Sequence, residues 1–322
     1  DVVVAHALVY DTDGTAADNV AGLEILGSSD VEIRDSVFAD NYDRTAAENG
    51  NQTGNSGNLV MFSNDGVIAI RRCAFYQSGG PDSQFSGFGV KYKHAGAIGS
   101  SFELVDSYIE GAWFGVGMGT AHALVHHNVI VNSGTGIASE DFGGPTHQWD
   151  QQFLANTIVA DIGFYVSPSL DWIDGAGGPW PDVTENAFAN NLLVDTSDEQ
   201  VQDRRTVLFD PYMDDERHDA LAAGIALDDN CYHREAGPAS FGFAESTNYG
   251  MAGAAFDLAG WRASYAFDDA SVEADPQLAD DMPATDGPCA AMGAFTDDHQ
   301  PVVGFADPLA CGDDVGVRRW ER

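Results

Sequence analysis

The sequence predicts an all-β fold, a right-handed parallel β-helix (solenoid) followed by an irregular C-terminal segment. One observation is a short strand motif that recurs along residues 1–235. The other is the composition of the strands, in which β-branched and aromatic residues alternate without helical periodicity. Repeats that keep their strands but vary in spacing are typical of solenoids whose loops differ in length. The shortest interval, from Ser107 to Asn128, is too short for a helix-containing repeat.

Each repeat is anchored on a small residue, mostly polar, that two apolar residues follow. The anchors are Ser36, Cys73, Ser107, Asn128, Asn156 and Asn191, with a seventh candidate at Asn230. We expect them to stack inward at a tight turn, with the asparagine side chains bonding to backbone along the stack. A second strand, usually led by glycine, lies between anchors: "AGLEIL", "GNLVMF", "FGVKYK", "FGVGMG", "TGIASE" and "IGFYVS".

The repeat pattern decays after about residue 235. Residues 1–235 are therefore predicted to form the β-helix, and residues 236–322 a segment that packs on or caps its last coils. Within that segment one short helix is expected at about 257–265, followed by coil rich in Asp, Pro and Gly. Cys289 and Cys311 flank this coil and are predicted to form a disulfide, whereas Cys73 is expected to be a buried small residue.

The net charge of −37 excludes several classes of partner. Phosphate contacts need clustered Lys and Arg, so nucleic acid is not expected, and neither are anionic membranes. No apolar stretch is long enough for a membrane span. We expect a secreted or cell-surface bacterial protein from a saline environment. Because residue 1 already belongs to an apolar strand, the chain is expected to be a trimmed piece of a longer precursor.

The chain has only two lysines, Lys91 and Lys93, two residues apart on one predicted strand. Alternation places them on the same outward face. Aligning the glycine-led strands puts Gly117 and Gly119 on the next coil, and Glu140 on the one after that. A glycine patch between lysine and acid, two coils wide, would hold one sugar ring.

Further polar and aromatic residues are expected to wall this floor. The predicted substrate-binding set is Gly117, Gly119, Tyr165, His147, Trp149, Asp150 and Trp172, since sugar faces pack on aromatic rings and sugar edges form hydrogen bonds. The acid-rich loops could also hold Ca²⁺ through Asp141, Asp150, Asp171 and Asp174. The alternative is that these acids are simply solvated.

The paired lysines suggest a reaction. Two adjacent ammonium groups repel, so one has a lowered proton affinity and can act as a base while the other neutralises a substrate carboxylate. β-Elimination from a uronic acid needs both roles. The predicted catalytic residues are Lys93, Lys91, His94, Glu140 and Asp141. Lys93 is expected to be the base, nearer the reaction centre, with Lys91 and Tyr165 lining the adjacent subsite. The alternative is a solvated pair of lysines.

The coil pattern resembles the pectate-lyase-like β-helix superfamily of secreted bacterial proteins. Within it the lysine strand "FGVKYK" resembles that of chondroitinase B and related alginate lyases. The resemblance implies that Lys91 or Lys93 is the base and that an arginine about one coil later assists as acid. The next coil reads "GVGMGTAH", without that arginine, so His122 or His94 would have to take the acid role.

Three functions remain open from the sequence. The first is a lyase that acts on a uronate-containing polysaccharide. The second is a glycoside hydrolase that uses Glu140 or Asp141 with Asp150 as an acid/base pair. The third is a cell-surface β-helix without catalysis.

Overall fold

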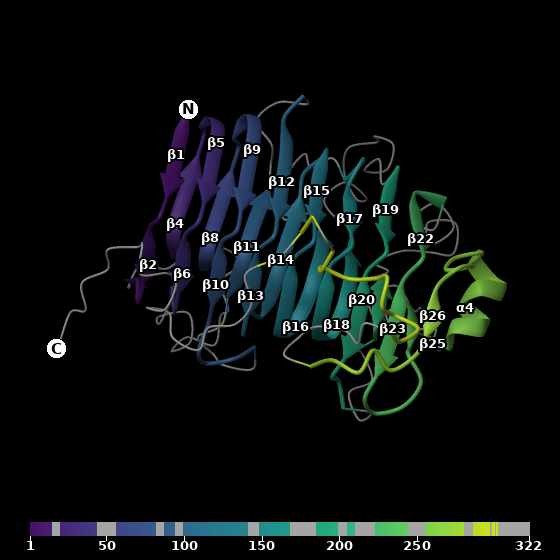
Figure 1. Cartoon of the computed structure of the whole chain (residues 1–322). Helices are drawn as coiled ribbons and strands as arrows, with labels where there is room; N and C mark the ends of the chain where they lie inside the picture. Colours follow the sequence, from purple (N-terminus) through teal and green to yellow (C-terminus); the bar gives the residue numbers. More distant parts are fainter. Residues whose placement is uncertain are drawn as a thin grey trace, which may run out of the picture.

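The computed structural model describes residues 1–14, 20–43, 56–81, 87–93, 99–140, 148–167, 185–198, 205–209, 223–243, 255–279, 286–296, 298–299 and 301. These residues form an all-β protein with parallel sheets, in which strands follow one another across the molecule in chain order (Figure 1). This arrangement is compatible with the predicted solenoid.

The first row of strands is a sheet of its own. It runs through β1 (Val2–Ala5), β5 (Ser29–Arg34), β9 (Asp65–Arg71), β12 (Ser101–Val105), β15 (Ala123–His126), β17 (Gln152–Leu154), β19 (Asn186–Ala189) and β22 (Ile225–Asp228). All neighbours in this row pair in parallel.

The second sheet contains two further rows. The second row runs through β2 (Leu8–Tyr10), β6 (Val37–Ala39), β10 (Ala74–Tyr76), β13 (Tyr108–Glu110), the first halves of β16 (Val129–Glu140) and β18 (Thr157–Ser167), β20 (Leu192–Asp195), β23 (Cys231–Arg234) and β26 (Val272–Glu273). The third row runs through β4 (Ala21–Leu26), β8 (Gly57–Phe62), β11 (Phe88–Lys93), β14 (Phe114–Gly119), the second halves of β16 and β18, β21 (Val207–Phe209) and β24 (Phe241–Phe243).

Three short strands lie outside these rows. β25 (Ala255–Phe256) pairs antiparallel with β24, and β3 (Asp13–Gly14) pairs with β7 (Tyr42–Asp43). Among the described residues, no helix is long and apolar enough to cross a membrane.

The predicted anchor ladder is confirmed at the turn between the first and second rows. Each asparagine accepts a hydrogen bond from the backbone N–H of the preceding anchor, as in Asn128 N–H to Asn156 Oδ1 (3.1 Å) and Asn156 N–H to Asn191 Oδ1 (2.8 Å). The seventh candidate, Asn230, continues the ladder from Asn191 at 2.9 Å. All seven anchors are buried: Ser36, Cys73, Ser107, Asn128, Asn156, Asn191 and Asn230. The buried anchors are therefore hydrogen-bonded from one repeat to the next.

The residue before each anchor makes the turn sharp enough to aim the anchor inward. Every one of them has a left-handed backbone, with φ between 49° and 56°: Asp35, Arg72, Asp106, His127, Ala155, Asn190 and Asp229. Side chains that tolerate this conformation, mainly Asp and Asn, occupy most of these positions.

Glycine opens the third-row strands because there is no room for a side chain. A Cβ added to Gly115 would collide with Ile130, and one added to Gly136 would collide with Ile158. The glycine thus lets each third-row strand pack on the second-row strand of the neighbouring repeat. Inside lies one continuous apolar core that includes Val90, Tyr92, Val116 and Met118.

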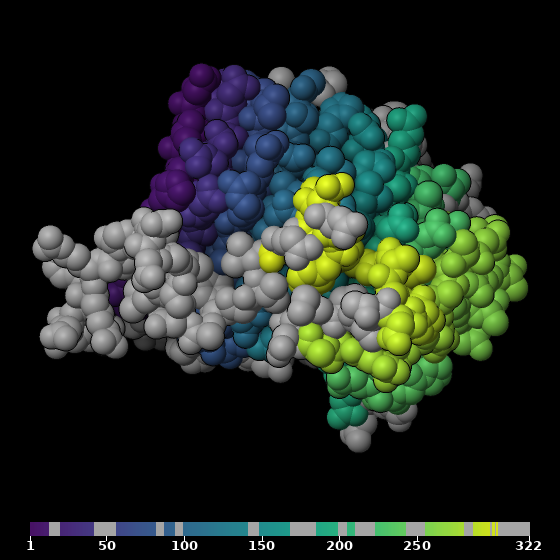
Figure 2. All heavy atoms as spheres, viewed as in Figure 1, coloured from purple at the N-terminus to yellow at the C-terminus, as the bar shows by residue number. Residues whose placement is uncertain are grey.

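The predicted helix is confirmed as α4 (Leu258–Tyr265), capped by Asp257, whose side chain accepts a hydrogen bond from the Gly260 N–H at 2.7 Å. Its Trp261 is fully buried. Residues 286–296, 298–299 and 301, drawn in yellow, lie on the outer surface of the middle strands (Figure 2). The Ala294 N–H donates to Thr157 Oγ1 there, at 3.0 Å.

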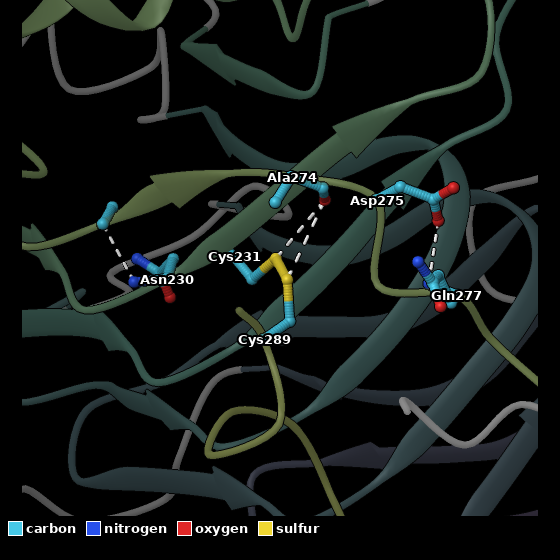
Figure 3. Close-up of a disulfide and its surroundings, with 7 residues drawn as sticks. Asn230, Cys231, Ala274, Asp275, Gln277 and Cys289 are labelled. Atoms are coloured by element: carbon cyan, nitrogen blue, oxygen red, sulfur yellow. Dashed lines mark hydrogen bonds between the residues drawn. A yellow bond between two sulfur atoms is a disulfide. The ribbon is translucent and has the colours of Figure 1, made fainter. Parts of the chain in front are cut away.

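The predicted Cys289–Cys311 disulfide is wrong, because Cys289 bonds to Cys231 (Figure 3). Cys231 follows the anchor Asn230 and faces outward, where residues 286–296 pack against it. Cys311 lies outside the described residues. Cys73 is buried, as predicted, and burial raises the pKa of its thiol to about 12.

Candidate functional site

The two lysines lie in the third row with the neighbours that the alignment predicts. Lys91 pairs with Gly117, and Lys93 with Gly119. On the other side they pair with Val60 and Phe62. The intervening Tyr92 belongs to the core, so both lysines project from the outer face.

Lys91 and Lys93 differ in burial. Lys91 is only 2% exposed, whereas Lys93 is partly exposed. Each ammonium lies over an aromatic ring: Lys91 Nζ is 4.2 Å from the centre of the Phe88 ring, and Lys93 Nζ is 4.8 Å from that of Phe62. Such cation–π contacts offset part of the cost of removing the charge from water.

The pKa of Lys91 is lowered to about 7, mainly by burial and further by the charge of Lys93. The carboxylate of Glu140 acts in the opposite direction and raises it. An amine with this pKa is substantially neutral at physiological pH and can accept a proton. The lysine with the lowered pKa is thus Lys91, whereas the sequence analysis placed Lys93 nearer the reaction centre.

Gly117, Gly119 and Glu140 complete the floor of the candidate site. Gly117 and Gly119 are buried and place no side chain beside the lysines. Ala138 follows Gly117 in the register and Tyr165 follows Ala138. Glu140 lies at the end of the same β16 strand and interacts electrostatically with Lys91. Six predicted residues therefore share one outer face: Lys91, Lys93, Gly117, Gly119, Glu140 and Tyr165.

An aromatic rim beside Lys91 was missed by the sequence analysis. Phe88 and Phe114 stack with ring centres 5.1 Å apart, and Trp113 meets Phe114 edge-on at 4.5 Å. Tyr165 continues the group, 6.5 Å from Phe114. The signal was available, because an aromatic residue directly precedes the glycine in "FGVKYK" and "FGVGMG". Since that glycine faces the core, the residue before it faces outward.

A second group lies at the turn after Gly119. His122 Nδ1 is 2.7 Å from Asp150 Oδ2, and the His122 ring meets the Trp149 ring edge-on at 5.7 Å. The backbone N–H of His122 also donates to the backbone carbonyl of Trp149 at 3.2 Å. Trp149 and Asp150, both predicted to bind substrate, therefore hold a histidine. A carboxylate on one ring nitrogen orients the other for proton transfer.

This turn is fixed from inside by buried amides. Ser139 Oγ donates to Gln151 Oε1 at 2.6 Å, and Gln151 Nε2 donates to the Thr120 carbonyl at 2.7 Å. Gln148 Nε2 donates to Ser139 Oγ at 2.9 Å. Ser139 follows Ala138 on β16, so the network ties the His122 turn to the strand that ends in Glu140. These hydrogen bonds limit movement of the turn relative to the floor, although the buried Gln148 Oε1 accepts none.

The remaining predicted residues lie outside the described part of the chain: His94, Asp141, His147, Asp171, Trp172 and Asp174. Of the four acids predicted to bind Ca²⁺, only Asp150 is described, and it contacts His122.

Comparison with protein-family models, curated proteins and solved structures finds no match to this chain. The chemistry of the site is therefore the basis for any functional conclusion.

Proposed function

We propose that this chain is a right-handed parallel β-helix of the pectate-lyase-like type and a lyase that cleaves a uronate-containing polysaccharide by β-elimination. The observation that carries the proposal is a buried lysine with a pKa of about 7, next to a second lysine, on a glycine floor with an aromatic rim. Strands that succeed one another in parallel rows, joined by an asparagine ladder, support the fold.

The reaction assigns one role to each lysine. Lys93 neutralises the uronate carboxylate and so makes the neighbouring C5–H more acidic. Lys91, as the neutral amine, takes the C5 proton. The electron pair of the C–H bond forms the C4–C5 double bond, and the C4–O glycosidic bond breaks. His122, oriented by Asp150, donates a proton to the leaving oxygen.

The surroundings suit this substrate. Trp113, Phe114 and Tyr165 offer ring faces for neighbouring sugars. Lys93 supplies local positive charge in a chain whose net charge is −37, which a polyanion would otherwise avoid. A protein without catalytic need gains little from a lysine at this depth, because burying an amine costs free energy.

Two further parts of the proposal concern the setting. The protein acts outside the cell or on the cell surface of a bacterium from a saline environment. Calcium on the loops that carry Asp141, Asp150, Asp171 and Asp174 offsets local negative charge. Activity and melting temperature that do not change with a calcium chelator would remove the ion from the proposal.

The test is a panel of uronate-containing and neutral polysaccharides, followed by two readouts. A lyase produces unsaturated ends that absorb ultraviolet light, in step with new reducing ends. Reducing ends without that absorbance would show a hydrolase, and neither signal on any substrate would favour a non-catalytic scaffold.

Substitution of each lysine in turn then identifies the catalytic base. Lys91→Met should lower kcat by about 10²–10⁴-fold, and Lys93→Met should mainly raise KM through loss of carboxylate binding. Arg72→Met, which removes an exposed cation paired with Asp35 at another turn, is the control and should leave the rate unchanged. The kcat/KM of the wild type should rise with pH through about 7 as Lys91 loses its proton. A Lys91→Met enzyme with more than about a tenth of the wild-type rate would exclude Lys91 as the base.

A further inference from the structure

Three histidines from distant parts of the chain meet at the turn between the first and second rows. His126 ends β15, His127 follows it, and His299 comes from the segment that lies on the outer surface. One possible ligand atom from each lies within 4.8 Å of the others. Among the described residues, this is the one group of three or more metal-binding side chains that comes this close.

The contacts between the rings show how the nitrogens are disposed. His126 Nδ1 and His127 Nδ1 are 2.8 Å apart, so one must present a lone pair to the other. The rings of His127 and His299 stack with centres 3.7 Å apart. All three side chains are partly exposed, which leaves the group accessible to an ion from solvent.

Carboxylates hold the far sides of two of these rings. His299 Nδ1 lies 2.9 Å from Asp106 Oδ1, and His126 Nε2 lies 3.4 Å from Glu103 Oε1. With a proton on each of these nitrogens, the opposite nitrogen of each ring carries the lone pair. Carboxylate–histidine pairs of this kind orient imidazoles for metal binding and increase their basicity.

The fold fixes the three residues independently of any ion. His127 has the left-handed backbone that directs the anchor Asn128 inward, and its N–H donates to the Ala155 carbonyl at 3.1 Å. His299 closes a short turn in which its N–H donates to Thr296 Oγ1 at 3.1 Å. The same segment is docked through Gly293 N–H, which donates to the Asn190 carbonyl at 2.9 Å.

We propose that His126, His127 and His299 bind one divalent transition-metal ion, of the Zn²⁺ class, and so fasten His299 and the segment 286–296 to the outer surface of the strands. Three neutral imidazoles suit Zn²⁺, Cu²⁺ or Ni²⁺ and not Ca²⁺ or Mg²⁺, which prefer oxygen ligands. Tetrahedral zinc with N ligands at about 2.0–2.1 Å needs nitrogens about 3.3 Å apart. The present separations lie on both sides of that value, from 2.8 Å between the Nδ1 atoms of His126 and His127 up to 4.8 Å within the group. The fourth position is left to water.

The test uses the full chain without a histidine tag, stripped with a chelator and titrated with Zn²⁺ alone by calorimetry. We expect binding that saturates at one equivalent and a raised melting temperature. His299→Ala should weaken binding by at least about 100-fold, and Asp106→Asn by about 10–100-fold. Substitution with Co²⁺ should give the visible absorption of a tetrahedral site.

The control is His6→Ala. His6 is exposed and has the same left-handed backbone after β1 as His127 has after β15, but it lies outside the group. This variant should bind Zn²⁺ like the wild type. The proposal is overturned if the wild type binds no Zn²⁺, or if His299→Ala binds it as tightly as the wild type. The second result would place the ion elsewhere, and the first would make the stacked rings a packing contact only.

Discussion

The anchor ladder lies inside the molecule, and the lysine face, the outer face that carries Lys91 and Lys93, lies outside it. Both are built by stacking residues of neighbouring parallel strands, but the stacked side chains differ. Both stack one side chain per coil along parallel strands. The ladder repeats one chemistry, so that Asn128, Asn156 and Asn191 satisfy one another. The lysine face changes chemistry at each coil, from Lys91 to Gly117 to Ala138.

This difference separates stability from function. A repeated polar side chain finds its partner in the next coil, and each copy lowers the free energy of the fold. Lys91 is held in a buried position where its proton affinity falls. Departures from the repeat are therefore the places to look for chemistry.

The largest expected effect is on the ladder. Asn156→Ala removes the donors to the Val125 carbonyl and to Asn191 Oδ1, and it leaves the Asn128 N–H without its acceptor. Buried groups left without partners cost about 1–3 kcal/mol each, so we expect a loss of about 3–5 kcal/mol in the free energy of unfolding. Urea denaturation measures this loss in the free energy of unfolding. Ser107→Ala, which removes fewer hydrogen bonds, should cost about half as much. An equal loss in both variants would show that the loss does not follow the number of hydrogen bonds removed.

The next largest effect is an increase in the free energy of unfolding, and it concerns the lysine face. Lys91 has a pKa of about 7 when folded, against an ordinary value of 10.5. Between these values the unfolded chain binds a proton that the folded chain lacks, so the free energy of unfolding rises with pH through this window. Lys91→Met should remove this contribution and raise stability at neutral pH by about 1–3 kcal/mol.

Lys93→Met is the matched variant for that measurement. It removes the neighbouring charge but keeps Lys91, so the pH dependence should persist and begin at a higher pH, since one cause of the lowered pKa is gone. If Lys93→Met abolished the pH dependence and Lys91→Met kept it, the roles of the two lysines in the proposal would be reversed.

A smaller effect is expected at the aromatic rim. Trp113→Ala removes a ring that packs on Phe114 at the outer edge of the lysine face. One stacked sugar is worth about 1–2 kcal/mol, so KM or Kd for the polysaccharide should rise by about 10-fold with kcat little changed. Binding can be measured on the Lys91→Met background, where cleavage is slow. Unchanged affinity would place the substrate elsewhere.

The smallest expected effect concerns the left-handed residue that precedes each anchor of the ladder. Ala155 has a left-handed backbone with φ 51°, where the preceding and following turns use polar residues. Ala155→Asn should raise stability by about 0.5–1 kcal/mol, because Asn tolerates this conformation better. Ala187→Asn, in the strand β19, should bring no gain. Both can be read from the melting temperature, and a loss at Ala155 would show that its methyl group packs usefully.

Local pattern in the sequence determined the repeating part of the protein. The anchors, the glycine-led strands and the helix α4 were predictable because each depends on residues close in sequence or one coil away. The pairing of Lys91 with Gly117 and of Lys93 with Gly119 followed from the same register. The rim residues Phe88 and Phe114 were also predictable from that register, because each directly precedes the glycine of its strand.

Tertiary structure decided what the non-repeating segment does and how the site is charged. The Cys231–Cys289 bond and the meeting of His299 with His127 depend on where residues 286–301 dock, through contacts such as Ala294 to Thr157. No periodic pattern encodes that docking, since it arises from long-range packing. The pKa of Lys91 likewise reflects the burial of its amine among groups from several coils, a sum over space that a linear sequence does not display.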